Sequence, residues 1–391
     1  MNKAYYRTLY ASYIGYITQA IVNNLAPLLF VVFQREFDLS VTQIGFLVTF
    51  NFTVQILTDL VAARYVETWG YKPSVVAAHF FCALGLVGLG VFPGLLGNPY
   101  LGLLTAITVY AIGGGLIEVL VSPIVEALPL DGKSAAMSLL HSFYCWGHTA
   151  VVLLSTLFFA FAGIENWRLL TCLWASVPFL NIFLFASAPI KVLVEKGESL
   201  PLRKLLSTKL FWVLFLLMVC SGASEQAMSQ WSSYFAETGL QVSKTLGDLL
   251  GPCLFAVLMG LSRVFYGVKG NAIPLKTFIS VSSVLCIGSY LLAVFSPVPL
   301  LSLVGCAVCG LSVCIMWPGC FSLAAQHCPQ GGTAMFALLA LAGDIGCGGG
   351  PSVVGLVSDG FGGELKAGLL AAILFPIFLI WGIRQLRKME G

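Results

Sequence analysis

Twelve long apolar stretches fill most of this chain and leave only short gaps between them. Each has about the 20 residues that a helix needs to cross the hydrocarbon core of a bilayer. The 391 residues are 58% hydrophobic and 9% charged, whereas soluble domains carry roughly 25% charged residues. So little charge cannot give a globule of this size a wettable surface, and we expect its outer solvent to be lipid. The predicted spans are 8–33, 43–66, 74–96, 100–127, 134–162, 167–189, 209–236, 246–268, 273–296, 299–325, 332–358 and 366–386.

Helices are the secondary structure that we predict for all of these stretches. A backbone group left unpaired in lipid costs several kcal/mol, and a helix pairs its backbone groups within its own segment. A membrane β-barrel would instead show segments of alternating apolar and polar residues. The apolar runs of this chain do not alternate, so the predicted fold class is an all-α membrane protein.

Basic residues gather in alternate gaps between the spans. With the N-terminus inside, only Arg35, Arg168, Lys244 and Lys366 of the 20 basic residues fall in outer segments, and Arg263 lies within a span. This positive-inside bias predicts a multi-pass protein of the inner (plasma) membrane with both termini cytoplasmic. The fifteen basic residues of the inner segments are Lys3, Arg7, Arg64, Lys72, Lys133, Lys191, Lys196, Arg203, Lys204, Lys209, Lys269, Lys276, Arg384, Arg387 and Lys388.

Several classes of protein and site are not favoured by the composition. The net charge of +3 comes from the basic residues of the inner segments, so it does not indicate nucleic-acid binding. The 12 cysteines lie in or beside apolar spans, where we expect them to act as small hydrophobic side chains. Cys306 and Cys309 have CxxC spacing without a second pair or a nearby histidine, so no metal site is predicted. The first apolar run is full length and lacks a small-residue cleavage site, so we expect no cleavable signal.

The chain divides into two similar halves. A polar interval over 191–208 separates six spans from six more, and the run 39–45 resembles the run 242–247 at the equivalent place in the second half. Two duplicated bundles suit alternating access, in which halves rock around a site near the middle of the membrane. We therefore predict two pseudo-symmetric six-helix bundles, 1–190 and 209–391, joined by a cytoplasmic loop over 191–208.

A few ionisable side chains lie inside the predicted spans, where such groups are costly and usually face a cavity or a partner. Glu118 lies deep in the fourth span, and a buried structural pair is the alternative to a functional role. Asp344 lies in the eleventh span, and an ion pair with Arg263 of the eighth is its structural alternative. Polar residues also align along one face of four other spans: Ser12, Tyr16, Gln19 and Asn23; Asn51, Gln55 and Asp59; His141, Cys145 and His148; Ser221, Glu225, Ser229 and Ser232, with Asn24, Gln226 and Gln230 beside these faces.

These groups suit a transporter of polar solutes. A carboxyl group in a membrane cavity can load a proton from one side and release it to the other. Carboxylates, amides and indoles together can bind a polyhydroxy ligand through acceptors, donors and an apolar face for stacking. Helix irregularity is expected at Trp317-Pro318, and the glycine-rich run 343–351 should permit bending or very close helix packing.

Motifs along nearly the whole chain resemble the major facilitator superfamily and, within it, the fucose–galactose–glucose:proton symporter family. The loop between the second and third spans holds a degenerate copy of the superfamily's Gly-Asp-Arg pattern at Glu67, Gly70 and Lys72. The closer resemblance is carried by Asn23-Asn24-Leu25, Phe33-Gln34, Glu118 with Ser122-Pro123, the set Leu139, Phe143 and Gly147, the set Gly222, Glu225 and Trp231, then Trp317-Pro318 and Val357-Ser358-Asp359.

This resemblance implies roles for individual positions. The implied sugar-contacting residues are Asn24, Glu118, His141 and Trp317. It also implies that Glu118 takes part in proton coupling. The family's second coupling carboxylate, an Asp in the first span, is replaced here by Pro27, so His141 would share the proton role, or a sodium ion would replace the proton.

From the residues and the resemblance we predict a secondary active transporter that imports a small polar solute, a monosaccharide or related compound, by proton or sodium symport. The alternative is a proton-coupled efflux antiporter for amphipathic compounds, whereas a receptor or a membrane enzyme is not favoured. We expect a monomer in the lipid bilayer, without cofactor, bound metal or nucleic-acid partner. The predicted solute-binding residues are Asn24, Glu118, His141, Glu225, Gln226, Trp231 and Trp317, and the predicted ion-coupling residues are Glu118, His141 and Asp344.

Overall fold

The computed structural model describes residues 3–39, 41–191, 202–243, 246–247 and 249–389, and these residues form helices and turns without a β-strand. The all-α prediction is confirmed. Eleven helical segments within this part are long and apolar enough to cross a membrane, so the protein is a multi-pass membrane protein.

The chain forms two compact units, each of which is considered by itself. The first comprises Met1–Leu130, Phe143–Glu198 and Gly332–Ala337, and the second comprises Asp131–Ser142, Ser199–Gly331 and Leu338–Gly391. The predicted division at 191–208 stays a prediction, and residues 192–201 of that loop lie outside the described part.

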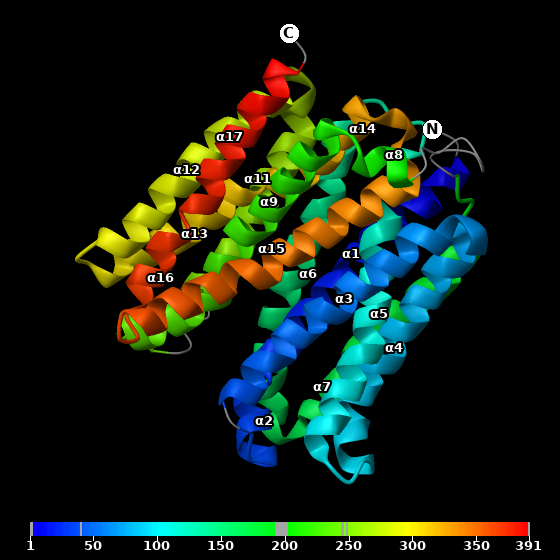
Figure 1. Cartoon of the computed structure of the whole chain (residues 1–391). Helices are drawn as coiled ribbons and strands as arrows, with labels where there is room; N and C mark the ends of the chain where they lie inside the picture. The colour runs from blue at the N-terminus through cyan, green and yellow to red at the C-terminus, as the bar shows by residue number, and fades with distance from the viewer. Residues whose placement is uncertain (1–2, 40, 192–201, 244–245, 248, 390–391) are drawn as a thin grey trace. The chain divides into compact units, whose positions relative to one another are not determined.

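The helices that lie mainly in the first unit are α1 (Lys3–Leu28), α2 (Phe30–Phe37), α3 (Val41–Trp69), α4 (Tyr71–Leu95), α5 (Pro99–Glu126), α6 (Lys133–Ala162) and α7 (Trp167–Ser187). Two of them, α4 and α5, lie side by side (Figure 1). Gly113 of α5 makes this contact close, because a methyl group there would lie 2.5 Å from Ala78 O of α4. Small residues let membrane helices approach in this way.

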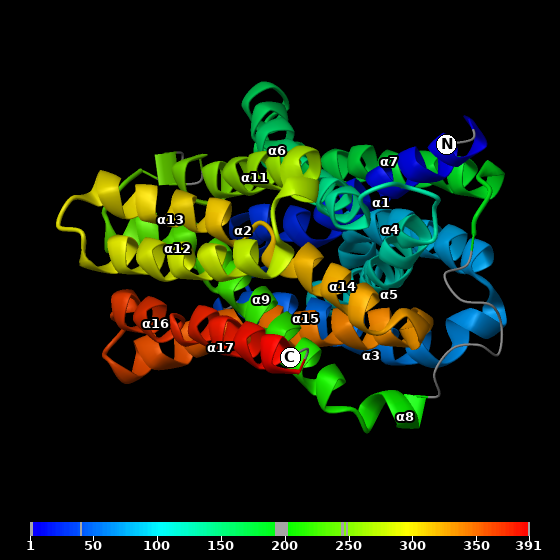
Figure 2. The same ribbon diagram turned by 90° about the horizontal axis from the view of Figure 1, so that it is seen from above.

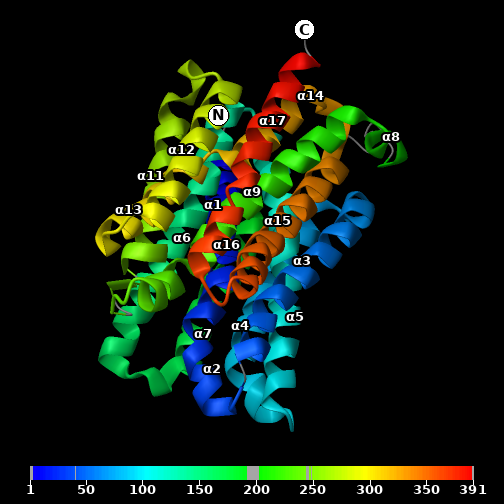
Figure 3. The same cartoon turned by 60° about the vertical axis from the view of Figure 1, so that its left-hand side comes forward.

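The helices that lie mainly in the second unit are α8 (Leu202–Leu206), α9 (Lys209–Tyr234), α11 (Leu254–Lys269), α12 (Leu275–Phe295), α13 (Pro299–Val313), α14 (Met316–His327), α15 (Gly332–Gly360), α16 (Leu365–Ala371) and α17 (Leu374–Lys388). Helices α12 and α13 run side by side (Figure 2), and α16 and α17 follow one another in one span (Figure 3).

The predicted span 8–33 is interrupted in the structure. Helix α1 ends at Leu28, and Leu29 separates it from α2 with φ −96° and ψ 0°. Pro27 lies in the last turn of α1, where it cannot donate a helical hydrogen bond. Helix α1 is also absent from the eleven apolar segments, because its sequence carries polar residues such as Gln19, Asn23 and Asn24.

Two predictions about helix irregularity in the second unit are confirmed. The predicted span 299–325 breaks between Val313 and Met316, next to Trp317-Pro318. The glycine run of α15 provides close packing, because a methyl group on Gly350 would lie 2.6 Å from Ala223 O of α9. The glycine run does not interrupt the helix, since α15 is continuous over Gly332–Gly360.

Candidate solute site

Helices α1, α3 and α5 of the first unit meet in a buried network of amides around one carboxylate. Gln19 Nε2 donates to Glu118 Oε2 at 2.9 Å and to Gln55 Oε1 at 2.9 Å. Glu118 is only 7% exposed, although it is a carboxylate in a membrane helix. Gln19 therefore uses both amide hydrogens to join three helices at the predicted functional carboxylate.

The network continues from Gln55 through the next polar turn of α1 and α3. Asn23 Oδ1 accepts from Gln55 Nε2 at 3.0 Å and from Asn51 Nδ2 at 3.1 Å. The four-residue spacing of Gln19 and Asn23, and of Asn51 and Gln55, puts each pair on one helix face. A glycine lets α5 approach this face, because a methyl group on Gly114 would lie 3.0 Å from Gln19 Oε1.

Two oxygens of this network are acceptors that the described residues leave without a hydrogen-bond donor. They are Gln19 Oε1 and Asn51 Oδ1, and both are buried. A buried acceptor without a donor costs about 1–3 kcal/mol. Asn23 and Asn51 also border a pocket of about 10 Å³, room for about one water molecule. The network thus offers acceptors to a ligand that brings donors.

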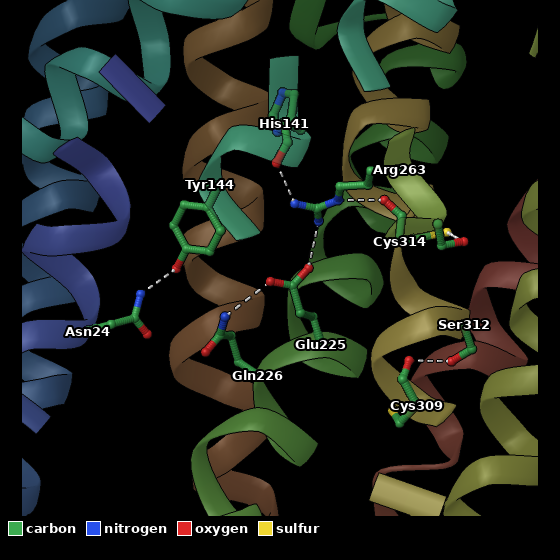
Figure 4. Close-up of polar contacts among 10 residues, drawn as sticks. Asn24, His141, Tyr144, Glu225, Gln226, Arg263, Cys309, Ser312 and Cys314 are labelled. Atoms are coloured by element: carbon green, nitrogen blue, oxygen red, sulfur yellow. Dashed lines mark hydrogen bonds and ion pairs between the residues drawn. The ribbon is translucent and has the colours of Figure 1, made fainter. Parts of the chain in front are cut away.

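Asn24 lies beside this network in α1 and contacts α6. Asn24 Nδ2 donates to Tyr144 Oη at 3.3 Å (Figure 4). Within its own helix, Asn24 Nδ2 also donates to Ala20 O at 2.8 Å. Asn24 and Glu118 are the predicted solute residues that lie in the first unit. Tyr144 was not predicted, although it is three residues from His141 and so near the predicted polar face of α6.

In the second unit, the predicted residues Glu225 and His141 both contact a buried arginine. Arg263 of α11 is 2% exposed and forms an ion pair with Glu225 of α9, with Nη2 3.2 Å from Oε2. Arg263 Nη1 donates to His141 O at 3.0 Å (Figure 4). The sequence suggested Asp344 as a partner of Arg263 and did not predict the pair with Glu225. The pair of Arg263 with Asp344 stays a prediction.

Gln226 and Trp231 extend this polar region along α9. Gln226 Nε2 donates to Glu225 Oε1 at 3.3 Å, and Gln230 Nε2 donates to Gln226 Oε1 at 2.9 Å. Further along the helix, Trp231 Nε1 donates to Pro351 O of α15 at 3.0 Å. Glu225, which belongs to the predicted polar face of this span, is therefore hydrogen-bonded to the amide of Gln226, and Gln226 to that of Gln230.

Trp317 lies at the start of α14, directly after the helix break. Its six-membered ring occupies the place where a methyl group on Gly343 of α15 would sit. Asp344, the next residue of α15, is 1% exposed. His141 of α6 is likewise buried, and its ring centroid lies 5.9 Å from that of Phe321. Trp317, His141 and Asp344 thus all belong to the second unit, and all three side chains are buried.

The described residues do not provide a metal centre. Nowhere in the part of the chain that the structure describes do three His, Cys, Asp or Glu side chains gather in a way that could hold a metal ion. The chemistry that these sites can perform is hydrogen bonding, ion pairing and proton exchange.

Comparison with known proteins identifies the family. Residues 12–351 match the family model of the Major Facilitator Superfamily. None of the curated proteins compared with this chain by sequence matches it.

Solved structures share its fold at low sequence identity. The Escherichia coli fucose:proton symporter FucP is 17% identical with a TM-score of 0.78, over 98% of this chain and 99% of that chain. The proton:xylose symporter XylE is 12% identical with a TM-score of 0.84, over 99% of this chain and 96% of that one. The human organic anion transporter MFSD10 is 16% identical with a TM-score of 0.74, over 97% and 99%. With a family match over most of its length, the chain belongs to the major facilitator superfamily of membrane transporters.

Proposed function

We propose that this protein imports a small hydroxyl-rich solute, a monosaccharide or a close relative, together with a proton. The observation that carries the proposal is the buried network in which Gln19 joins Glu118 to Gln55. A carboxylate held among amides inside a membrane helix bundle is expensive and marks a solute or proton pathway.

The groups of the network suit hydroxyl ligands. Glu118 and the acceptor oxygens of Gln19 and Asn51 can receive hydrogen bonds from hydroxyl groups. An organic anion would bring further acceptors and a like charge to Glu118. These polar groups therefore support a sugar-like solute over an amphipathic or anionic one, and on that basis we favour import over drug efflux.

In the second unit, Glu225 and Gln226 would bind hydroxyl groups, and the indoles of Trp231 and Trp317 would cover an apolar ring face. In the first unit, Asn24 would offer an amide in addition to the network around Glu118. Alternating access would change which side of the membrane reaches these residues.

Glu118 is the residue to which we assign proton coupling, with His141 and Asp344 in assisting roles. Glu118 would carry a proton while solute is bound and release it on the inner side. The proton is our choice of coupling ion because FucP and XylE are described as proton symporters. Sodium dependence of uptake is an outcome that would overturn this part of the proposal.

The topology that we propose places the protein in the inner (plasma) membrane as a monomer, with both termini cytoplasmic. The support is the positive-inside bias of the basic residues. Labelling of single cysteines introduced near the termini, in whole cells and in inverted vesicles, tests this orientation.

Uptake in proteoliposomes tests the transport function. When a transported monosaccharide is added outside, the external medium should become alkaline and the sugar should accumulate uphill. Glu118→Gln should bind and equilibrate the sugar without uphill accumulation. Glu165→Gln makes the same change at an exposed site and should behave like the wild type. If Glu118→Gln accumulates solute as well as the wild type, the coupling role of Glu118 is wrong.

A further inference from the structure

Arg263 makes hydrogen bonds to three different parts of the second unit. Its Nη2 contacts Glu225 Oε2 of α9, and its Nη1 donates to His141 O of α6 at 3.0 Å. Its Nε donates to Cys314 O at 2.8 Å, in the break between α13 and α14 (Figure 4). A guanidinium group can do this because its donors form a rigid planar fork.

The carbonyl group of Cys314 is available because of Pro318. In a continuous helix, Cys314 O would accept from the backbone N–H of residue 318. Proline has no N–H, so this acceptor would stay unpaired in the membrane interior, at a cost of several kcal/mol. Arg263 supplies the donor that the proline cannot. The break before Trp317 and the buried arginine therefore depend on each other.

The three contacts connect positions that were predicted for solute binding on separate helices. Glu225 is held through its carboxylate, His141 through its backbone carbonyl, and Trp317 through the helix break three residues before it. Arg263 itself was predicted only as an ion-pair partner of Asp344. We propose that Arg263 is the positioning residue of the solute site in the second unit, a fork that fixes Glu225 relative to the helix break; this inference rests on the proposed transport function.

Stability alone does not account for such an arginine. A buried ion pair gains little over a well-packed apolar replacement, since both charges lose their hydration. An apolar residue at 263 with another at 225 would fill the same space without that cost. An apolar pair cannot donate directional hydrogen bonds to the Glu225 carboxylate and to Cys314 O at the same time, as Arg263 does.

A double-mutant cycle on solute affinity tests the proposal. Arg263→Lys keeps the charge and loses the fork, and the half-saturating solute concentration should rise about tenfold or more while the maximal uptake rate changes less. Glu225→Gln should also raise it, and Arg263→Lys should raise it by less in the Glu225→Gln background than in the wild type, because only the hold on Cys314 O remains to be lost. Arg384→Lys, at an exposed site of α17, is the matched control. Effects of the two changes that simply add would overturn the positioning role.

Hydrogen exchange provides a measurement that needs no solute. Arg263→Lys should speed amide exchange in the segment 315–321, because the hold on Cys314 O is lost. Glu225→Gln should leave this segment protected, because Arg263 still contacts Cys314 O. Equal protection in Arg263→Lys and the wild type would overturn the link to the helix break. If the wild type transports no sugar, the proposed function fails, while the exchange experiment still decides whether Arg263 holds the break.

A folding control keeps both experiments interpretable. Arg263→Gln alone leaves the Glu225 carboxylate buried without its ion-pair partner, which can prevent folding. The double variant Arg263→Gln with Glu225→Gln removes both charges and should melt near the wild-type temperature. In this double variant the segment 315–321 should still exchange faster than in Glu225→Gln alone. Protection equal to that of Glu225→Gln would show that charge balance is the whole role of Arg263 and would overturn the proposal.

Discussion

The ring of Trp317 lies on the backbone of Gly343, in the space that a side chain at position 343 would fill. Gly343→Ala should therefore push the indole aside, and the half-saturating solute concentration should rise about tenfold, because overpacking shifts neighbouring side chains at a cost of about 1–3 kcal/mol. Concentration-dependent uptake measures this effect.

The control for Gly343→Ala lies five residues along the same helix. A methyl group on Gly348 meets open space, and replacing a helical glycine by alanine stabilises by roughly 0.5–1 kcal/mol. Gly348→Ala should thus leave uptake unchanged and raise the melting temperature slightly. If the two variants have the same affinity, the packing of Trp317 on Gly343 has no role in solute binding.

Gln19→Leu should abolish uphill accumulation and lower the free energy of unfolding by about 1–3 kcal/mol, because Glu118 and Gln55 both lose a buried donor. Uptake and thermal melting in detergent measure the two effects. The control is Thr53→Val, which removes an exposed hydroxyl of α3 that bonds within its own helix. Wild-type accumulation in Gln19→Leu would contradict the role of the network.

Tyr144→Phe should have a small effect, an increase of about threefold or less in the half-saturating concentration. Asn24 Nδ2 loses a long contact of 3.3 Å but still donates to Ala20 O at 2.8 Å. Asn24→Ala removes the amide itself and should have a much larger effect if Asn24 binds solute. An equally small effect of both changes would remove Asn24 from the site.

Pro318→Ala should change stability and affinity in opposite directions. The new backbone N–H can complete the helix by donating to Cys314 O, which stabilises α13 and α14 as a continuous span. The same bond competes with Arg263 and moves Trp317, so the melting temperature should rise while solute affinity falls. Melting in detergent and equilibrium solute binding measure the two quantities. A fall in both would mean that the break is needed for folding rather than for the site.

The helical fold was largely predictable because hydrophobic length and turn residues act locally. Pro318 predicted the interruption of the tenth span, which the structure confirms. The break at Leu29 was missed because Pro27 was not weighed as a helix terminator. When Pro27 is not counted as a helix terminator, the sequences of α1 and α2 look like one continuous span.

The polar faces of single helices were also predictable from four-residue spacing, as with Gln19 and Asn23. Which donor meets which acceptor was not, because it depends on the rotation and depth of each helix in its unit. Arg263 illustrates this limit. Its charge and burial followed from the sequence, but the spacing could not distinguish Glu225 from Asp344 as its partner.

The polar character of α1 has a consequence for the synthesis of the protein. Gln19 Nε2 donates to acceptors on α3 and α5, and Asn23 Oδ1 accepts from donors on α3. When α1 leaves the ribosome those helices do not yet exist, and a polar segment partitions poorly into lipid by itself. Stable insertion of α1 must therefore wait until α3 and α5 have been synthesised. The helices of this unit then assemble cooperatively rather than inserting one at a time.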